Sequence, residues 1–305
     1  MDDFEIDDSL VRSLVREQHP DLAGLDVREV SGGWDNQLWR LGEELAVRMP
    51  RTARAPALLR KEHQWLPTLA PRLPLPVPTP LRMGEPSARF PRPWTIARWV
   101  PGEPADRAPI SDEGAADILA GFLKALHVKA PAEAPDSPDR GVPLKRLTDG
   151  VEKTLEEVAS EGVSADVLQQ VRDVWDEAVA APEWEGPPVW LHGDFHPANV
   201  VVSDGTLSGV IDFGDICAGD PAVDVSAAWV LLPAGAAARF FDAYAQADEA
   251  MIRRARGLAA MKCIFLIRMG RAGERGLPGG KPWGPAGRAG LDRVLAAIQE
   301  PGDSG

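Results

Sequence analysis

The stretch WLHGDFHPANVVVSDGTLSGVIDFGDICAGDPAVD, residues 190–224, decides both the fold class and the chemistry expected of this chain. Asp194 and Asn199 lie in a segment that contains glycine and proline, which favour a loop. An Asp-Gly pair further along predicts a tight turn that leads into a strand ending at Asp212. We expect the resulting hairpin to fold back, so that the side chains of Asp194, Asn199 and Asp212 meet.

The residue types at these three positions indicate a magnesium site. Two carboxylates and an amide offer hard oxygen ligands, which suit Mg²⁺ better than zinc. Magnesium commonly keeps ligand positions for phosphate oxygens, so Asn199 and Asp212 would be enough protein ligands. Asp194 is then left to accept a proton from a hydroxyl group or to orient it.

The motifs in this stretch resemble the catalytic and metal-binding loops of the kinase superfamily, and most closely those of the aminoglycoside phosphotransferase family. That family has the pattern H-G-D-x-x-x-x-N followed by D-x-G, which matches HGD at 192–194, Asn199, and DFG at 212–214. The resemblance implies that Asp194 orients or deprotonates the acceptor hydroxyl, and that Asn199 and Asp212 hold Mg²⁺ on the phosphates.

The resemblance extends over nearly the whole chain of 305 residues and implies its fold class. We expect an α+β, two-lobed protein-kinase-like fold with a small β-rich N-lobe and a larger, mainly helical C-lobe. The segment 100–109, rich in proline, glycine and charge, is the best candidate for the boundary. Residues 1–100 would then form the nucleotide-binding lobe, and residues 101–305 the catalytic and substrate-binding lobe.

Hydrophobic periodicity predicts the individual elements. In the first hundred residues it predicts one strong helix, together with several strands: a helix at 55–70 and strands at 26–31, 37–41, 44–49 and 91–100. Beyond the boundary it predicts a mostly helical chain, with short strands around a loop between 187 and 213. The helices are expected at 114–127, 144–160, 164–180 and from 221 onward, with a break at 276–285, and an Asp-Gly turn leads into a strand at 204–212.

A phosphate-binding loop is expected between the first two strands, in SGGWDN at 31–36. Kinases fold a glycine-rich loop over the nucleotide at this place, which makes Gly32 and Gly33 candidate nucleotide-binding residues. The segment is not G-x-G-x-x-G, and an ordinary hairpin turn is the alternative.

By position, Arg48 and Glu62 stand where kinases have a strand lysine and its helix glutamate partner. A guanidinium group binds phosphate oxygens in a fork and stays charged, so arginine is chemically suitable there. The alternative is a surface strand residue and a solvated helix residue. Arg98, Trp99 and Val100 stand at the hinge, whose backbone would meet the purine; a place for Trp99 in the core is the alternative.

Four further residues near these motifs have two readings each. His127 matches a Leu-His pair common in the family. We expect it to form structural hydrogen bonds, with a catalytic role as the alternative, and we expect the same of His192 as a brace of its loop. Asp220 and Asp224 match a family position that braces the catalytic loop, and N-capping of a helix is the alternative.

The composition narrows the class of partners. The net charge of -13 would repel nucleic acid, and the acidic N-terminus has no basic region typical of a signal peptide. No apolar run is long enough to span a membrane. The two cysteines, Cys217 and Cys263, have no disulfide spacing, so we expect reduced thiols in a cytoplasmic protein. The expected oligomeric state is a monomer or a homodimer.

The expected activity is transfer of the γ-phosphoryl group of ATP or GTP to a hydroxyl of a small molecule. Among acceptors we prefer an antibiotic such as an aminoglycoside or macrolide, with choline, homoserine or a sugar as the alternative. Acidic residues such as Asp242, Asp248 and Glu249 could bind amino groups, whereas basic residues at 253–256 and 267–276 make that end mixed in charge.

Two other classes of function are weaker. His192 and His196 superficially suggest a zinc-dependent hydrolase, but Gly193 and Pro197 break the helix that their spacing would need. A non-catalytic pseudokinase would typically lack one of the catalytic or metal-binding residues, and this chain retains all of them.

Overall fold

The structure is a computed structural model that describes residues 5–30, 33–276 and 280–299. The chain folds into two compact units. The first unit runs to Pro101 and also contains Gly209–Asp215. The second consists of Gly102–Ser208 and the residues from Ile216 onward. The functional assignment of the two predicted lobes stays a prediction.

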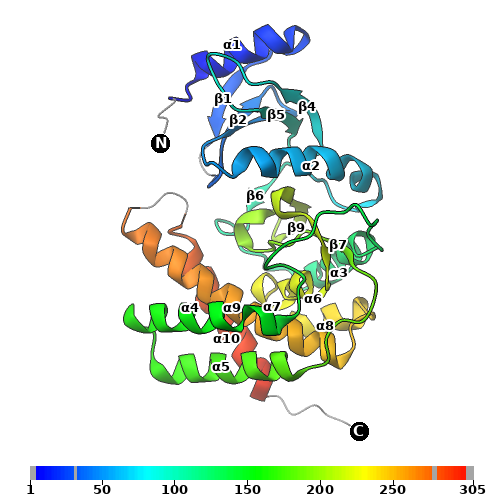
Figure 1. Ribbon diagram of the computed structural model, residues 1–305, viewed down its shortest axis with the longest axis vertical. Coiled ribbons are helices and arrows are strands. Elements are labelled where there is room, and N and C mark those ends of the chain that lie inside the picture. The colour runs from blue at the N-terminus through cyan, green and yellow to red at the C-terminus, as the bar shows by residue number, and fades with distance from the viewer. Residues whose placement is uncertain (1–4, 31–32, 277–279, 300–305) are drawn as a thin grey trace. The chain divides into compact units, whose positions relative to one another are not determined.

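An antiparallel five-stranded sheet forms the centre of the first unit (Figure 1). Its strand order is β1-β2-β3-β5-β4, with β1 Val27–Val30, β2 Asn36–Leu41, β3 Leu45–Pro50, β5 Trp94–Arg98 and β4 Pro80–Gly84. The register sets Val47 opposite both Trp39 and Ile96, and all three side chains are buried. These three side chains belong to one buried apolar cluster on the sheet, and β3 and β5 are buried at nearly every position.

Two helices accompany this sheet. Helix α2, Ala55–Leu69, contacts β4 and β5, and α1, Asp8–Gln18, contacts β1. Asp7 caps α1, since its side chain accepts a hydrogen bond from the Leu10 N–H at 2.7 Å. The prediction of a single helix in the first hundred residues was therefore wrong. The buried face of α1 is only Val11, Leu14 and Val15, a short stripe among charged residues.

The second unit is built mainly of helices. They are α3 Ala115–Leu126, α4 Thr148–Ser160, α5 Ala165–Ala180, α6 Ala222–Val225, α7 Ala227–Val230, α8 Ala236–Ala243, α9 Glu249–Glu274 and α10 Trp283–Gln299. The long helix α9 packs against α5, α6 and α10 (Figure 1). A side chain at Gly257 would collide with Ala178 of α5, so glycine permits the close approach of these helices.

Short strands surround the segment that carries the motifs. β7 Val189–Leu191 pairs with β10 Cys217–Gly219, and β6 Glu103–Pro104, β8 Val200–Ser203 and β9 Thr206–Val210 form a three-stranded sheet. The motif loop begins where β7 ends and finishes where β8 begins. Together with the helices and the larger sheet, these strands confirm the predicted α+β class.

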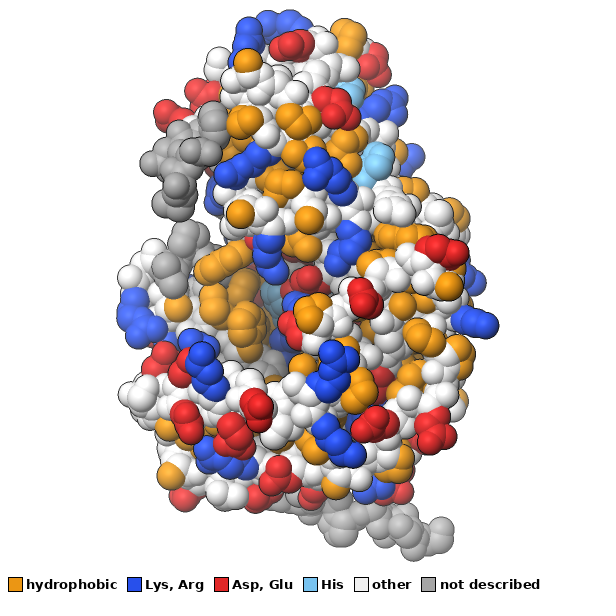
Figure 2. Space-filling view, in the orientation of Figure 1, with side chains coloured by type: hydrophobic (Ala, Val, Ile, Leu, Met, Phe, Trp, Pro, Cys, Tyr) orange, Lys and Arg blue, Asp and Glu red, His pale blue; other side chains and the backbone are white. Residues whose placement is uncertain are grey.

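The apolar character of the helices and the charges on the surface can be compared with the expectations from the sequence. Within the described ranges, no helix combines the length and the apolar character needed to cross a bilayer. Acidic and basic side chains are interspersed on the face formed by α4 and α5 (Figure 2). The mixture of charges was expected at 242–276, where Arg253 pairs with Glu249 and Arg268 pairs with Glu157.

Candidate active site

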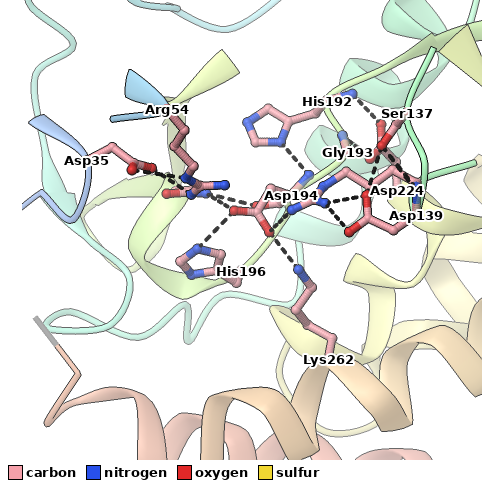
Figure 3. A network of polar contacts seen from close by, with 12 residues as sticks. Asp35, Arg54, Ser137, Asp139, His192, Gly193, Asp194, His196, Asp224 and Lys262 are labelled. Carbon is pink, nitrogen blue, oxygen red and sulfur yellow. Dashed lines mark hydrogen bonds and ion pairs between the residues drawn. The ribbon is translucent and has the colours of Figure 1, made fainter. Parts of the chain in front are cut away.

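Asp224 fixes the start of the loop that carries Asp194 (Figure 3). Its Oδ2 accepts a hydrogen bond from the His192 N–H at 2.7 Å, and its Oδ1 accepts one from the Gly193 N–H at 2.8 Å. The Asp224 side chain is fully buried. Of the two readings weighed for Asp224, bracing of the loop is the one that the structure shows.

A second layer of hydrogen bonds fixes Asp224 in turn. His127 Nε2 lies 3.3 Å from Asp224 Oδ2, and His127 Nδ1 lies 2.6 Å from the hydroxyl of Tyr244. Burial raises the pKa of Tyr244, and the carboxylates of Asp224 and Asp220 add to the rise, so the hydroxyl keeps its proton. The consistent arrangement is that Tyr244 donates to Nδ1 while Nε2–H donates to Asp224. His127 has the structural role expected of it.

Asp220 behaves differently from Asp224. Its Oδ1 accepts from the Ala222 N–H at 3.0 Å, at the start of α6. Its Oδ2 accepts from Arg254 Nε of α9 at 2.7 Å, and both side chains are nearly buried. The capping alternative therefore describes Asp220, which in addition ties α6 to α9.

Asp194 lies among groups that stabilise its negative charge (Figure 3). Its Oδ1 accepts from Lys262 Nζ at 2.6 Å and lies 3.9 Å from Arg140 Nη2. Its Oδ2 accepts from Asn199 Nδ2 at 3.1 Å and lies 3.5 Å from His196 Nε2. Burial acts to raise the pKa of Asp194, but the charge of Lys262 and the adjacent His196 and Arg140 hold that pKa well below its ordinary value.

Two of these neighbours were missed by the sequence analysis. Lys262 comes from α9, far along the chain from Asp194, and Arg140 comes from the loop before α4. No motif or spacing in the sequence relates them to Asp194, because only the packing of α9 brings Lys262 to the loop.

The first unit holds a second polar cluster, around Arg48. Arg48 Nη1 of β3 donates to both carboxylate oxygens of Glu62 of α2, each at 2.6 Å. Its Nη2 donates to Asp212 Oδ1 at 3.2 Å. Arg48 and Glu62 are buried, which argues against the surface alternative for both.

Burial and charge act in opposite senses on this pair. Burial raises the pKa of Glu62, against the lowering effect of the Arg48 guanidinium. Burial alone would lower the pKa of Arg48, but Glu62 and Asp212 raise it, so the guanidinium stays charged. Asp212 has a φ of 63°, a left-handed conformation that aspartate tolerates, and its side chain is about half exposed.

The residues predicted to hold Mg²⁺ fit that ion chemically. Asn199 uses its Nδ2 to donate to the backbone oxygen of Asp194 at 2.9 Å and to its carboxylate, which leaves the amide oxygen as the atom for a cation. The half-exposed Asp212 supplies carboxylate oxygens. Both are hard donors. The two residues belong to different units, and their meeting around one ion stays a prediction.

The zinc alternative finds no support in the same region. Nδ1 of His192 accepts from the Asp194 N–H, and Nδ1 of His196 accepts from the Ala198 N–H. Across the part of the chain that the structure describes, no three His, Cys, Asp or Glu side chains are grouped as a metal centre. Each ring thus has a structural hydrogen bond within its own loop.

The predicted phosphate loop is only partly described, because Gly32 lies outside the described residues. Gly33 has a φ of 83°, and a side chain there would collide with the carbonyl oxygen of Asn36, so only glycine fits. The buried Asp35 accepts from Thr52 Oγ1 and from Arg54 Nη2, each at 2.6 Å. These bonds hold the end of the loop against the start of α2.

The predicted hinge follows β5. The N–H groups of Arg98 and Trp99 donate to the carbonyls of Thr79 and Glu44, at 3.0 and 2.7 Å. The ring of Trp99 lies 4.3 Å from the guanidinium carbon of Arg40, and Val100 is buried. A purine would have to use other backbone groups here, so the hinge role of these residues stays a prediction.

Comparison with known proteins finds phosphotransferases both by sequence and by structure. A model of the phosphotransferase enzyme family matches residues 26–258. An aminoglycoside 3'-phosphotransferase from Escherichia coli is 29% identical over 140 residues, which are 45% of this chain and 51% of that protein. The chain therefore spans about half the length of this curated relative.

Solved structures resemble the chain over nearly its whole length. A GDP complex of aminoglycoside 2'-phosphotransferase-IIIa aligns with a TM-score of 0.72 at 19% identity, covering 96% of this chain and 100% of the other. A macrolide 2'-phosphotransferase from Brachybacterium faecium aligns with a TM-score of 0.60 at 19% identity, covering 97% and 98%. The likeness confirms the predicted two-lobed class of fold.

Proposed function

The chain belongs to the phosphotransferase enzyme family, and from that membership we propose that it transfers a phosphoryl group from ATP or GTP to a hydroxyl of a small molecule. One observation carries the proposal more than any other. The carboxylate of Asp194 is held ionised chiefly by Lys262 and accepts a hydrogen bond from Asn199, on a loop whose backbone is anchored by buried hydrogen bonds. A carboxylate fixed in this way can accept the hydrogen bond of an acceptor hydroxyl.

The low pKa of Asp194 bears on the timing of proton transfer. Such a carboxylate is a weak base, so it would orient the hydroxyl first and take the proton late, when the new P–O bond has largely formed. Phosphoryl transfer through a loose transition state needs little earlier deprotonation, and positioning provides most of the rate enhancement.

The cluster around Arg48 would serve the phosphoryl donor. Glu62 fixes the guanidinium through Nη1, and the guanidinium stays charged, so it can bind phosphate oxygens. Gly33 would let the backbone of its loop approach a phosphate closely. Mg²⁺ held by Asn199 and Asp212 would neutralise charge on the phosphates.

The proposed acceptor is an antibiotic with a reactive hydroxyl group. Relatives and structural neighbours are named as aminoglycoside and macrolide phosphotransferases, which supports this class. A metabolite such as choline, homoserine or a sugar is the alternative. A cytoplasmic location, where nucleoside triphosphates are available, fits the proposal.

A screen of acceptors tests it. The purified chain is incubated with Mg²⁺, with ATP or GTP, and with single aminoglycosides, macrolides, choline, homoserine or sugars. Release of nucleoside diphosphate that depends on the acceptor, together with a phosphorylated acceptor in the mass spectrum, is the expected result. Asp194→Ala is the matched control. Hydrolysis that requires zinc, or phosphorylation that persists in the Asp194→Ala variant, would contradict the proposal.

A further inference from the structure

The ammonium group of Lys262 occupies one oxygen of the carboxylate that the proposed function assigns to the acceptor hydroxyl. Lys262 Nζ lies 2.6 Å from Asp194 Oδ1 (Figure 3). The two side chains are 20% and 21% exposed, so the pair is shielded but still reached by solvent. An acceptor that approaches Asp194 therefore meets a fixed positive charge beside its hydroxyl.

The charges near Asp194 are already balanced by the protein. Arg140 lies 3.9 Å from the same oxygen, and its own charge is paired with Asp139 at 2.9 Å. Lys262 therefore compensates Asp194 directly, and Arg140 is compensated by Asp139. Because Lys262 already neutralises it, the Asp194 carboxylate attracts an ammonium group of an acceptor only weakly. That ammonium group would have to displace Lys262 to reach the Asp194 carboxylate.

Aromatic rings lie near this pair. Phe265, one turn further along α9, is 42% exposed, and its ring centroid is 5.8 Å from Lys262 Nζ. Trp283 of α10 packs its ring 5.0 Å from that of His196, and its Nε1 donates to Asp106 at 3.1 Å. Rings of this kind favour flat, apolar parts of a ligand.

We propose that Lys262 is a specificity residue, which selects acceptors whose reacting hydroxyl lies beside a neutral or anionic group and disfavours those with an ammonium group there. The inference rests on the proposed phosphoryl transfer, and among the acceptors considered it favours the alternative of a neutral sugar over the cationic antibiotics. Its favoured acceptor class is a hydroxyl compound with a flat apolar part, rather than a polycation. Two positive charges within about 5 Å repel, and the effect grows as solvent is excluded.

A series of aryl sugars that differ only in charge tests the proposal. The probes are 4-nitrophenyl glucoside as the neutral member, the glucuronide as the anion and the 2-amino-2-deoxy glucoside as the cation, with kanamycin as a polycation. The wild type is expected to have a kcat/KM at least about tenfold higher for the neutral and anionic sugars than for the cationic one. Lys262→Gln should reduce that ratio below about threefold, whereas Lys262→Arg should keep it.

The control is Arg253→Gln, which removes a positive charge from α9 where Arg253 pairs with Glu249 at 3.4 Å. It should leave the charge preference unchanged. A wild type that prefers kanamycin would overturn the proposal. So would an equal loss for every acceptor in Lys262→Gln, because Lys262 would then serve the phosphoryl donor.

A second measurement needs no acceptor. Urea unfolding of the wild type, Asp194→Asn, Lys262→Gln and the double variant should show coupling of at least about fivefold in the unfolding equilibrium constant. Absence of coupling would overturn the proposal. A different outcome would refute the proposed function itself. In that case coupling is present, but neither the wild type nor Lys262→Gln phosphorylates any compound of the series or of the antibiotic screen. The specificity role would then fail together with the proposed function.

Discussion

Asp224 holds Gly193 in a left-handed backbone conformation: the Asp224 Oδ1 accepts the Gly193 N–H at 2.8 Å, while Gly193 has a φ of 82°. The next residue in the chain is Asp194. The position of the proposed catalytic carboxylate is therefore set by a glycine that can adopt this conformation and by a buried carboxylate that binds its N–H group.

Replacing Asp224 by alanine should destabilise the protein and reduce its activity together. The change leaves two buried N–H groups without an acceptor, which costs about 2–5 kcal/mol of unfolding free energy. Urea unfolding and nucleotide turnover measure the two effects. The control is Asp242→Ala at an exposed position of α8, which should stay within about 0.5 kcal/mol of the wild type. A fully stable and active Asp224→Ala variant would disprove the bracing role.

Tyr244→Phe should have a smaller effect than Asp224→Ala. It removes the hydroxyl that lies 2.6 Å from His127 Nδ1, and the buried nitrogen loses its donor. We expect a loss of about 1–2 kcal/mol in unfolding free energy, because a single buried hydrogen bond is lost. Urea unfolding checks this value. Unchanged stability would mean that Tyr244 contributes only its ring to the packing.

Glu62→Ala should leave the buried charge of Arg48 with Asp212 as its remaining carboxylate neighbour. Removing one partner of a buried ion pair costs about 3–5 kcal/mol, and the nucleotide should bind more weakly because Arg48 is no longer fixed. Arg48→Lys, which keeps the charge but not the fork, should bind the nucleotide better than Arg48→Ala. Unfolding and nucleotide titration of the three variants provide the comparison. Equal nucleotide affinity in all of them would contradict the role given to Arg48.

The low pKa of Asp194 predicts a pH dependence with a definite sign. The folded pKa is below the unfolded value of about 3.9, so the stabilising contribution is complete above about pH 5 and decreases as the pH falls through the folded pKa. The difference in unfolding free energy between the wild type and Asp194→Asn should therefore be constant from about pH 8 to 5 and shrink below about pH 4. In a Lys262→Gln background the decrease should be smaller, because loss of the Lys262 charge brings the folded pKa of Asp194 closer to the unfolded value. A difference that grows with acidity would have the wrong sign.

Removal of divalent metal should abolish turnover. EDTA is expected to weaken nucleotide binding and Mg²⁺ to restore it, because Asn199 and Asp212 are the proposed ligands. Asp212→Asn is the informative variant, since asparagine tolerates the φ of 63° that Asp212 adopts. It should need more Mg²⁺ for the same nucleotide affinity. Nucleotide binding that is indifferent to both EDTA and this variant would disprove the metal assignment.

Local sequence patterns predicted much of the fold. Alternation and helical spacing predicted four strands of the five-stranded sheet, β1, β2, β3 and β5, and the helix α2 within a few residues. Helix α1 was missed because its buried stripe is short and surrounded by charge. The strand β4, Pro80–Gly84, was missed because it follows directly on a proline-rich run.

The site could be predicted where its residues lie in one motif, or where the family resemblance assigns their positions, as for Arg48 and Glu62. Asp194 and Asn199 are close in sequence and also in space. Asp220 and Asp224 could not be told apart from the sequence, because their roles depend on Arg254 in one case and on His192 and Gly193 in the other. Lys262 could not be predicted for the same reason, because its contact with Asp194 depends on how α9 packs.

The most direct test of the account is the turnover of Asp194→Asn in the presence of an acceptor found by the screen. The variant keeps the size of the side chain but not its negative charge. We predict that kcat falls by about 10²–10⁴-fold while nucleotide affinity changes by less than about threefold. A variant with wild-type kcat would contradict the role of Asp194 and, with it, the proposed phosphoryl transfer mechanism.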